Sequence, residues 1–356
     1  MKFIKTLFDQ KHKKITVSYL LVIFLYLLIE ILTATHSISY LLSTLLIPTC
    51  CYIVVALGLN LVVGFSGDLS LGQSGFMCIG AFAGICAANY VNFLVDSVVL
   101  RVLAAIVVGA IVAGIFGYII SIPVFKLTGD YLAIVTLAFC QIIKSFFNNV
   151  YFGYDSNGLH FSFIDNTLKL KEDGVLLING PVGITGNEQF SSVTVCVILI
   201  LVSLFIIFNL INSKYGRAIM ATRENRVAAN SVGIDVTRAK TLAFVVSACL
   251  AGAGGAIYAL NYTTIAPAKF DFNLSILILV YVVLGGLGNV SGTIIATICL
   301  VLLPELLRFL QDYRMIIYAL VLILIMLISN NDKLKYYFKR LKDKVINIFR
   351  KDKTNA

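Results

Sequence analysis

Residues 58–76, GLNLVVGFSGDLSLGQSGF, interrupt an otherwise apolar chain with glycine, serine, aspartate and glutamine. Hydrocarbon offers no water to a peptide group that has left a helix, so such breaks occur where protein or a water-filled cavity surrounds them. Surroundings of that kind are typical of transport pathways. The stretch therefore predicts a chain that buries a helix break among several other membrane helices.

The composition predicts an all-α, polytopic membrane protein. The chain has 356 residues, of which 59% are hydrophobic and 13% charged, which is too apolar for a soluble domain. Its first apolar run, residues 15–34, is long enough to span a bilayer and is followed by many more, so we expect a span rather than a cleaved signal. The eight cysteines lie in apolar segments without CxxC spacing, which indicates small core residues.

Counting apolar runs predicts about ten transmembrane helices with Gly-rich helix breaks. The stretch 274–312 is longer than one span requires, and GGLGNVSG at 285–292 divides it into two short spans by a tight turn. The other expected spans are 15–34, 40–63, 75–95, 98–122, 131–150, 193–211, 241–262 and 314–330.

The charges of the connecting segments predict the orientation. Residues 1–14 carry a net charge of +4, 212–240 a net charge of +4 and 331–356 a net charge of +6, whereas 151–192 carries −3. Basic segments stay on the cytoplasmic side. We therefore expect cytoplasmic tails at 1–14 and 331–356, a membrane domain over 15–330, an extracytoplasmic loop at 151–192 and a cytoplasmic segment at 212–240.

Catalytic and metal chemistry find no support in the sequence. The chain has no GxxxxGK[ST], HExxH or GxSxG motif, so any ATP that drives it is hydrolysed by a partner. His12, His36 and His160 are scattered and form neither a metal site nor a catalytic pair. Nucleic-acid binding would need a soluble basic domain. We expect no catalytic residue, no metal and no cofactor.

The cytoplasmic segment 212–240 has the character of a docking element. It is rich in alanine and charged residues, and Gly233 is predicted to end a helix, since glycine is common at helix C-termini. We expect a short amphipathic helix, a glycine turn and a second helix that enters the membrane. The alternative interpretation is a solvated basic loop that only sets orientation.

The break itself has two interpretations. Its small and polar residues could line a pathway where backbone N–H groups meet a passing carboxylate. They could equally be packing residues that let helices approach closely. The candidate pathway residues are Gly64, Ser66, Gly67, Asp68, Ser70, Gly72 and Gln73.

Several segments resemble one transporter family. GLNLVVGFSGDLSLGQSGF, GDYLAIVTLAF, the run from GRAIMATREN to GGAIYAL, VVLGGLGNVSGT and LPELLR are similar, in this order, to permease subunits of branched-chain amino-acid ABC importers of the LivM type. The resemblance covers most of residues 50–310. The chain departs from the family pattern at Cys140 and Gln141, where the family tends to have Gly-Glu, and in the loop 151–192.

The resemblance implies a transport subunit of a bacterial plasma membrane complex rather than an enzyme. The expected partners are a second permease subunit, two ATP-binding subunits and an extracytoplasmic solute-binding protein, besides membrane lipid. The expected cargo is leucine, isoleucine or valine. The residues implied to couple the permease to the ATPase are Gly216, Arg217, Arg223, Glu224, Ala228, Ala229 and Gly233.

Two alternatives remain open at this level. A permease for another small neutral solute, such as a sugar, a nucleoside, urea or an amide, would have the same scarcity of fixed charge in its spans. A stand-alone secondary transporter or channel would use 212–240 as a plain loop. A membrane enzyme would need a clustered catalytic set, which the sequence does not provide.

Overall fold

A computed structural model places the chain in two units, residues 1–298 and 299–356, each described by itself. It describes residues 10–35, 40–94, 97–126, 130–155, 158–163, 175–185, 192–308, 313 and 316–323. The expected tails lie largely outside these ranges, at 1–9 and 331–356. The helices and strands in chain order are α2 (Gln10–Ala34), α3 (Tyr40–Asn60), the π-helix η1 (Leu61–Ser66), α4 (Gln73–Leu94), α5 (Val98–Val124), α6 (Asp130–Asn149), β1 (Val150–Asp155), β2 (Gly158–Phe163), β3 (Val175–Asn179), η2 (Gly180–Val182), β4 (Ile184–Thr185), α7 (Val193–Asn212), α8 (Lys214–Glu224), α9 (Arg226–Ser231), α10 (Val236–Leu260), β5 (Thr264–Ile265), η3 (Pro267–Lys269), α11 (Phe272–Gly285) and α12 (Val290–Leu306).

The helical membrane fold is confirmed. Eight helical stretches in the described part of the chain are long and apolar enough to cross a bilayer, and α12 is a shorter apolar helix. The long apolar stretch 274–312 is divided as expected, since α11 ends at Gly285 and α12 starts at Val290. Of the tenth expected span, 314–330, residues 316–323 are helical and 324–330 lie outside the described residues.

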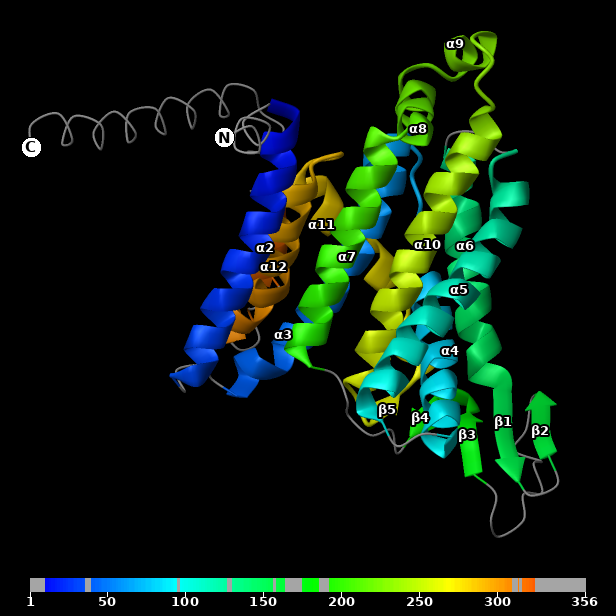
Figure 1. Ribbon diagram of the computed structural model, residues 1–356. Helices are drawn as coiled ribbons and strands as arrows, with labels where there is room; N and C mark the ends of the chain where they lie inside the picture. The colour runs from blue at the N-terminus through cyan, green and yellow to red at the C-terminus, as the bar shows by residue number, and fades with distance from the viewer. Residues whose placement is uncertain are drawn as a thin grey trace, which may run out of the picture. The chain divides into compact units, whose positions relative to one another are not determined.

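Three helices, α4, α5 and α10, form the centre of the first unit (Figure 1). Their closest contacts are made by glycine and alanine. A Cβ added to Gly80 of α4 would overlap the Gly252 carbonyl of α10, and one added to Gly252 would lie 2.5 Å from the Gly109 carbonyl of α5. Side chains are absent from these contacts, so the three backbones approach one another closely.

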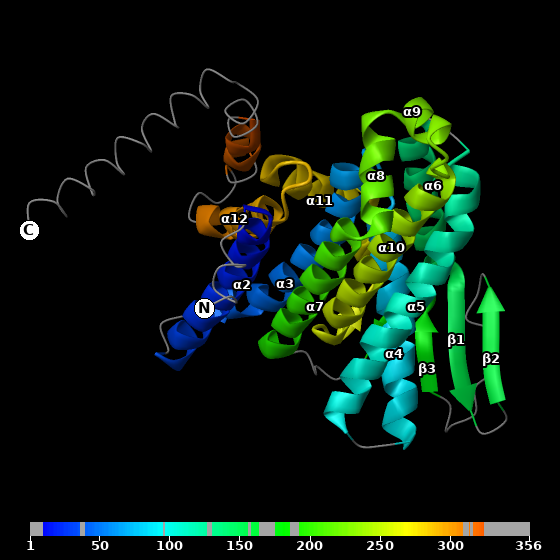
Figure 2. The same cartoon turned by 45° about the horizontal axis from the view of Figure 1, so that its top comes forward.

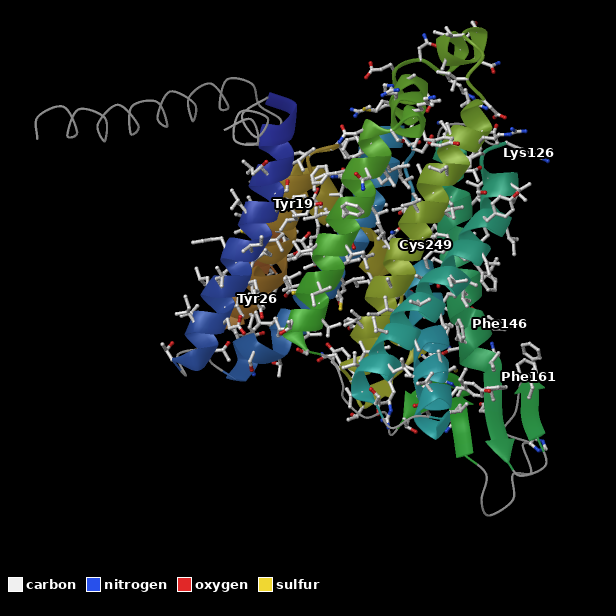
Figure 3. The ribbon with its side chains drawn as sticks, in the orientation of Figure 1. Tyr19, Tyr26, Lys126, Phe146, Phe161 and Cys249 are labelled. Carbon is white, nitrogen blue, oxygen red and sulfur yellow. The ribbon has the colours of Figure 1, made fainter. Side chains whose placement is uncertain are left out.

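The other helices of the first unit surround this centre. α3 packs against α10, α6 against α4, and α7 against α3. α2 lies along α7, where the Tyr26 hydroxyl is 3.4 Å from Thr194 Oγ1 and the rings of Tyr19 and Phe208 are 6.0 Å apart. Figure 3 shows Tyr19 and Tyr26 along α2. Most exposed residues of α2, α5 and α6 are large and apolar, as expected for a surface in contact with lipid.

Two ends of the first unit differ in structure. In Figures 1 and 2, α8 and α9 lie at one end and the antiparallel sheet β2-β1-β3 lies at the other. The sheet comes largely from the acidic segment 151–192, which the sequence analysis predicts to be an extracytoplasmic loop. A second, short pair joins β4 to β5, so this loop is fastened to the segment between α10 and α11.

Candidate functional site: the break and the docking segment

The break in the sequence is a break in the structure. The helix α3 continues as the π-helix η1, which ends at Gly67 in a left-handed conformation with φ 77°. Residues 67–72 have no regular secondary structure, and α4 begins at Gln73. A π-helix inserts one extra residue per turn and is frequent at functional sites. Glycine is required at position 67 because other residues disfavour a positive φ.

Six of the seven candidate pathway residues are packed or bonded within the protein. Gly64, Ser66, Ser70, Gly72 and Gln73 are buried, and Asp68 is half-buried, whereas Gly67 is exposed. The Gln73 amide donates to Ser247 Oγ of α10 at 3.1 Å. The Ser70 hydroxyl is buried and has no hydrogen-bond partner among the described residues.

The docking segment, residues 212–240, folds as two short helices rather than one. Ser213 caps α8 by accepting from Gly216 N–H, and Asn225 ends α8 and caps α9 by accepting from Val227 and Ala228 N–H. Gly233, at φ 85°, turns the chain, and Asp235 caps α10 by accepting from Arg238 N–H. The expected glycine turn and the helix that enters the membrane are both present. The break at Asn225 follows from its side chain, which satisfies two amides that a continuous helix would use.

The seven candidate coupling residues separate into two groups. Gly216 and Ala229 are buried, where their small size permits close packing. The exposed residues are Arg217, Arg223, Glu224, Ala228 and Gly233. Beside α9 lies a groove of about 560 Å³, bordered by Arg226, Val227 and Asn230 and by the turn 233–237.

The structure brings the break and the docking segment into contact, which sequence reasoning did not anticipate. Asp68 and Lys240 form an ion pair of 2.5 Å. Arg223 Nη1 donates to the Gly64 carbonyl oxygen at 2.5 Å. Beneath these bonds, a buried apolar cluster joins η1 to α8 and α10 through Leu61, Ile219, Ala239 and Ala243.

The turn between α11 and α12 packs on the other side of η1. Gly286 and Gly288 have φ values of 93° and 78°, so the predicted tight turn is confirmed. Asn60 Oδ1 accepts from Gly288 N–H at 2.9 Å, and Asn60 Nδ2 donates to Thr293 Oγ1 at 3.0 Å. A side chain at Gly64 would overlap Gly288, so the two segments touch through their backbones.

Two further polar groups lie among the membrane helices. The Ser74 hydroxyl, at the start of α4, is 2.7 Å from the Ser275 hydroxyl of α11 and 2.8 Å from Cys140 Sγ of α6. Lys144 of α6 pairs with Asp271 at 2.9 Å, and Gln141 donates to the same carboxylate at 3.2 Å. Ionisable groups in membrane helices are rare and are usually paired or functional. Cys140 and Gln141, the two departures from the family pattern, are therefore both hydrogen-bonded: Cys140 to Ser74 and Gln141 to Asp271.

A group of tyrosines lies where α3, α10 and the segment after α10 meet. The hydroxyls of Tyr52 and Tyr258 are 3.5 Å apart, and the ring of Tyr258 packs on that of Tyr262. Lys269 Nζ lies 4.0 Å from the centre of the Tyr262 ring. Burial, and then the neighbouring Tyr258, raise the pKa of the Tyr262 phenol, which therefore stays neutral.

No group of three or more histidine, cysteine or acidic residues that could hold a metal exists among the described residues. His160 lies on β2, and His12 lies in the first turn of α2. His36 lies outside the described residues. The contacts described above make the site a junction of backbone, glycine and charged side chains.

The chain is similar to known permeases. The profile described as branched-chain amino acid transport system / permease component matches residues 41–326. The high-affinity branched-chain amino acid transport system permease protein LivM of Salmonella typhimurium is 32% identical over 221 residues, which is 59% of this chain and 52% of that protein. LivM of Escherichia coli gives the same identity and coverage.

A third relative is the probable branched-chain amino acid transport permease protein LivH of Methanocaldococcus jannaschii, which is 34% identical over 102 residues, or 29% of this chain and 31% of that protein. No solved structure matches significantly. The alignment with the bacterial LivM proteins spans about half of their length. Since the family profile covers most of the chain, this protein belongs to the family of branched-chain amino acid transport system permease components.

Proposed function

We propose that this chain is one permease subunit of an ABC importer that carries branched-chain amino acids across the bacterial plasma membrane. Two partner ATP-binding subunits would hydrolyse the ATP, a second permease subunit would complete the pathway, and an extracytoplasmic solute-binding protein would deliver the cargo. The names of the LivM relatives support the cargo class. Both termini would be cytoplasmic, since the tails 1–14 and 331–356 are basic.

The observation that carries this proposal is the docking segment. Val227 and Val232 are 75% and 81% exposed on and beside α9, at the end of the unit away from the sheet. Apolar side chains grouped on a surface outside the membrane mark a site for a protein partner. Arg217 and Glu224 add charges that would fix the orientation of that partner. The groove beside α9 would receive part of the ATPase.

The sheet end supports the other half of the proposal. The loop 151–192 carries a net charge of −3 and is the longest connection between two spans. Its sheet is fastened by β4 to β5, next to the start of α11. A rigid surface there would receive the binding protein and lead towards Lys144 and Asp271. These two side chains are 24% and 29% exposed, and their opposite charges suit a zwitterionic cargo.

The decisive experiment is reconstitution of the chain with its expected partners in proteoliposomes. We expect labelled leucine to enter only when ATP, the ATPase subunits and the binding protein are all present. Val227→Asp should abolish co-purification of the ATPase, because a buried unpaired carboxylate at the interface is unfavourable. Phe161→Asp, on the exposed face of β2, is the matched control and should leave co-purification intact.

Other outcomes select the alternatives. Leucine uptake without any ATPase would establish a stand-alone transporter and overturn the importer proposal. ATP hydrolysis that responds to the binding protein without leucine uptake would retain the importer and change the cargo to another small neutral solute.

A further inference from the structure

The docking segment is fastened to the break at two separate points. Its first helix, α8, reaches the break through Arg223, whose guanidinium donates to the Gly64 carbonyl. Its far end, at the first turn of α10, reaches the break through Lys240, which pairs with Asp68. The part of the segment between these points, residues 224–239, carries α9 and the exposed surface proposed to meet the ATPase.

The Asp68–Lys240 pair is more enclosed than the other ion pairs described here. The side chains of Lys240 and Asp68 are 13% and 12% exposed, against 89% and 52% for the Arg238–Asp235 pair on the same helix. The second carboxylate oxygen of Asp68 accepts from Ser66 Oγ at 2.6 Å. An enclosed pair is a weak source of net stability, but it fixes one arrangement of the segments it joins, because separating the charges leaves both unpaired.

Arg223 is an exposed residue, but its guanidinium reaches back to the protein, where Nη1 donates to the Gly64 carbonyl oxygen. A Cβ at Gly67 would lie 2.9 Å from Arg223 Cγ, so the absence of a side chain at position 67 leaves room for the arginine stem. The carbonyl that Arg223 binds belongs to Gly64, whose backbone also touches Gly288 in the turn before α12. Movement of α8 therefore reaches η1 and, through Gly64, the turn after α11.

Some parts of the break have room to change position when α8 moves, and others are packed tightly against α8. Residues 67–72 form no helix, and η1 has the wider hydrogen-bond spacing of a π-helix. A cavity of about 540 Å³ borders Phe65 and the turn residues 287–291, so this side of the junction has room for a change in position. The apolar cluster around Leu61 and Ile219 keeps α8 and η1 together.

We infer that Asp68, Lys240 and Arg223 are positioning residues that transmit movement of the docking segment into the break and so link ATP turnover to opening of the pathway. This inference rests on the proposed function, because the movement originates in the partner ATPase. It gives Arg223 an internal role in place of direct contact with the ATPase, and it gives the break a mechanical role rather than one of binding the cargo. The same bonds could instead serve only to stabilise the fold. The test must therefore measure the coupling of transport to ATP hydrolysis separately from folding and assembly.

The test compares Asp68→Asn, Lys240→Met, Arg223→Gln and the exchange Asp68→Lys with Lys240→Asp in the reconstituted transporter. Arg308→Met is the matched control, because it removes a cation from an exposed pair with Glu305 outside the junction. Each variant is measured for ATPase co-purification, ATP turnover stimulated by the binding protein, and leucine uptake.

We expect the three single variants to retain the ATPase and to hydrolyse ATP, while the number of leucine molecules imported per ATP falls at least tenfold. The exchange should recover part of this ratio, and the control should match the wild type. Unchanged import per ATP in the single variants would overturn the inference. So would a loss of folding or assembly in Asp68→Asn and in the exchange alike, since that is the behaviour of bonds that serve only to stabilise the fold.

The same measurements distinguish failure of the proposed function from failure of this inference. If the wild-type chain shows no ATP-dependent uptake, the proposed function fails before any variant is compared. If the wild type is coupled and the variants are coupled equally well, the inference alone fails.

Discussion

At the scale of single residues, Lys144 and Asp271 form a pair of opposite charges among the membrane helices. Lys144 lies on α6 and Asp271 directly precedes α11; their charged atoms are 2.9 Å apart and both side chains are only partly exposed. Gln141 donates to the same carboxylate, so Asp271 has two donors on one face of α6. A charge at membrane depth without a partner is costly, which explains why the pair and the amide occur together.

Removing one member of this pair should be more harmful than removing both. We expect Lys144→Met to lower the free energy of unfolding by about 1–3 kcal/mol, because Asp271 then loses its strongest donor. The double variant with Asp271→Asn should recover most of that loss. Thermal unfolding of the purified proteins in detergent measures both effects. Equal losses in the single and the double variant would show that the side chains do not act as a pair.

At the scale of elements, the central helices pack closely because glycines at their contacts carry no side chain. Gly80, Gly109 and Gly252 place the backbones of α4, α5 and α10 in direct contact, and Ala113 completes the contact with Gly252. In a bilayer, close packing replaces the hydrophobic effect as the force between helices, so small residues gain importance. Of these three helices, α4 follows the break and α10 begins within the segment 212–240.

A larger residue at this contact should separate the helices. Gly252→Leu is expected to lower the free energy of unfolding by about 1–3 kcal/mol, since overpacking forces backbone shifts. Ala138→Leu, on the exposed face of α6, adds volume without a neighbour to displace and serves as the control. Thermal midpoints in detergent, measured side by side, test this. A control that falls as far as Gly252→Leu would mean that the contact is not tightly packed.

At the scale of the whole molecule, the first unit has one end for each side of the membrane. The docking segment has a net charge of +4 and the loop that forms the sheet has −3, and they lie at opposite ends. The bias of basic segments towards the cytoplasm therefore predicts one orientation for the unit. The end with the sheet also has an apolar cavity of about 500 Å³, lined in part by Phe146 and Phe161. Figure 3 labels these two side chains.

Labelling of single cysteines tests this orientation. In a background without the native cysteines, Val227→Cys should react with a membrane-impermeant maleimide only in inside-out vesicles. Phe161→Cys should react only in intact, right-side-out membranes, since both positions are exposed at opposite ends. Ile134→Cys, on the lipid-facing side of α6, should react in neither and is the control. Reaction of both test positions from one side would contradict the proposed topology.

The sequence by itself determined the class of the protein, its helical spans and the two Gly-rich breaks, and it predicted a docking role for the segment 212–240. These properties depend on local composition: apolar length defines a span, and glycine with a positive φ defines a turn. The sequence also permitted the family to be identified, because the motifs around residues 58–76 and 212–240 keep their order along the chain.

Only the tertiary structure decided that the two segments form one junction. Asp68 and Lys240 are separated by 172 positions, and Gly64 and Arg223 by 159, so no local pattern places them together. It also decided that Asn225 divides the docking segment into two helices and that the acidic loop forms a sheet. The physical reason is the same in each case: pairing between distant segments depends on which surfaces the packed helices bring into contact, and that packing is a property of the complete fold.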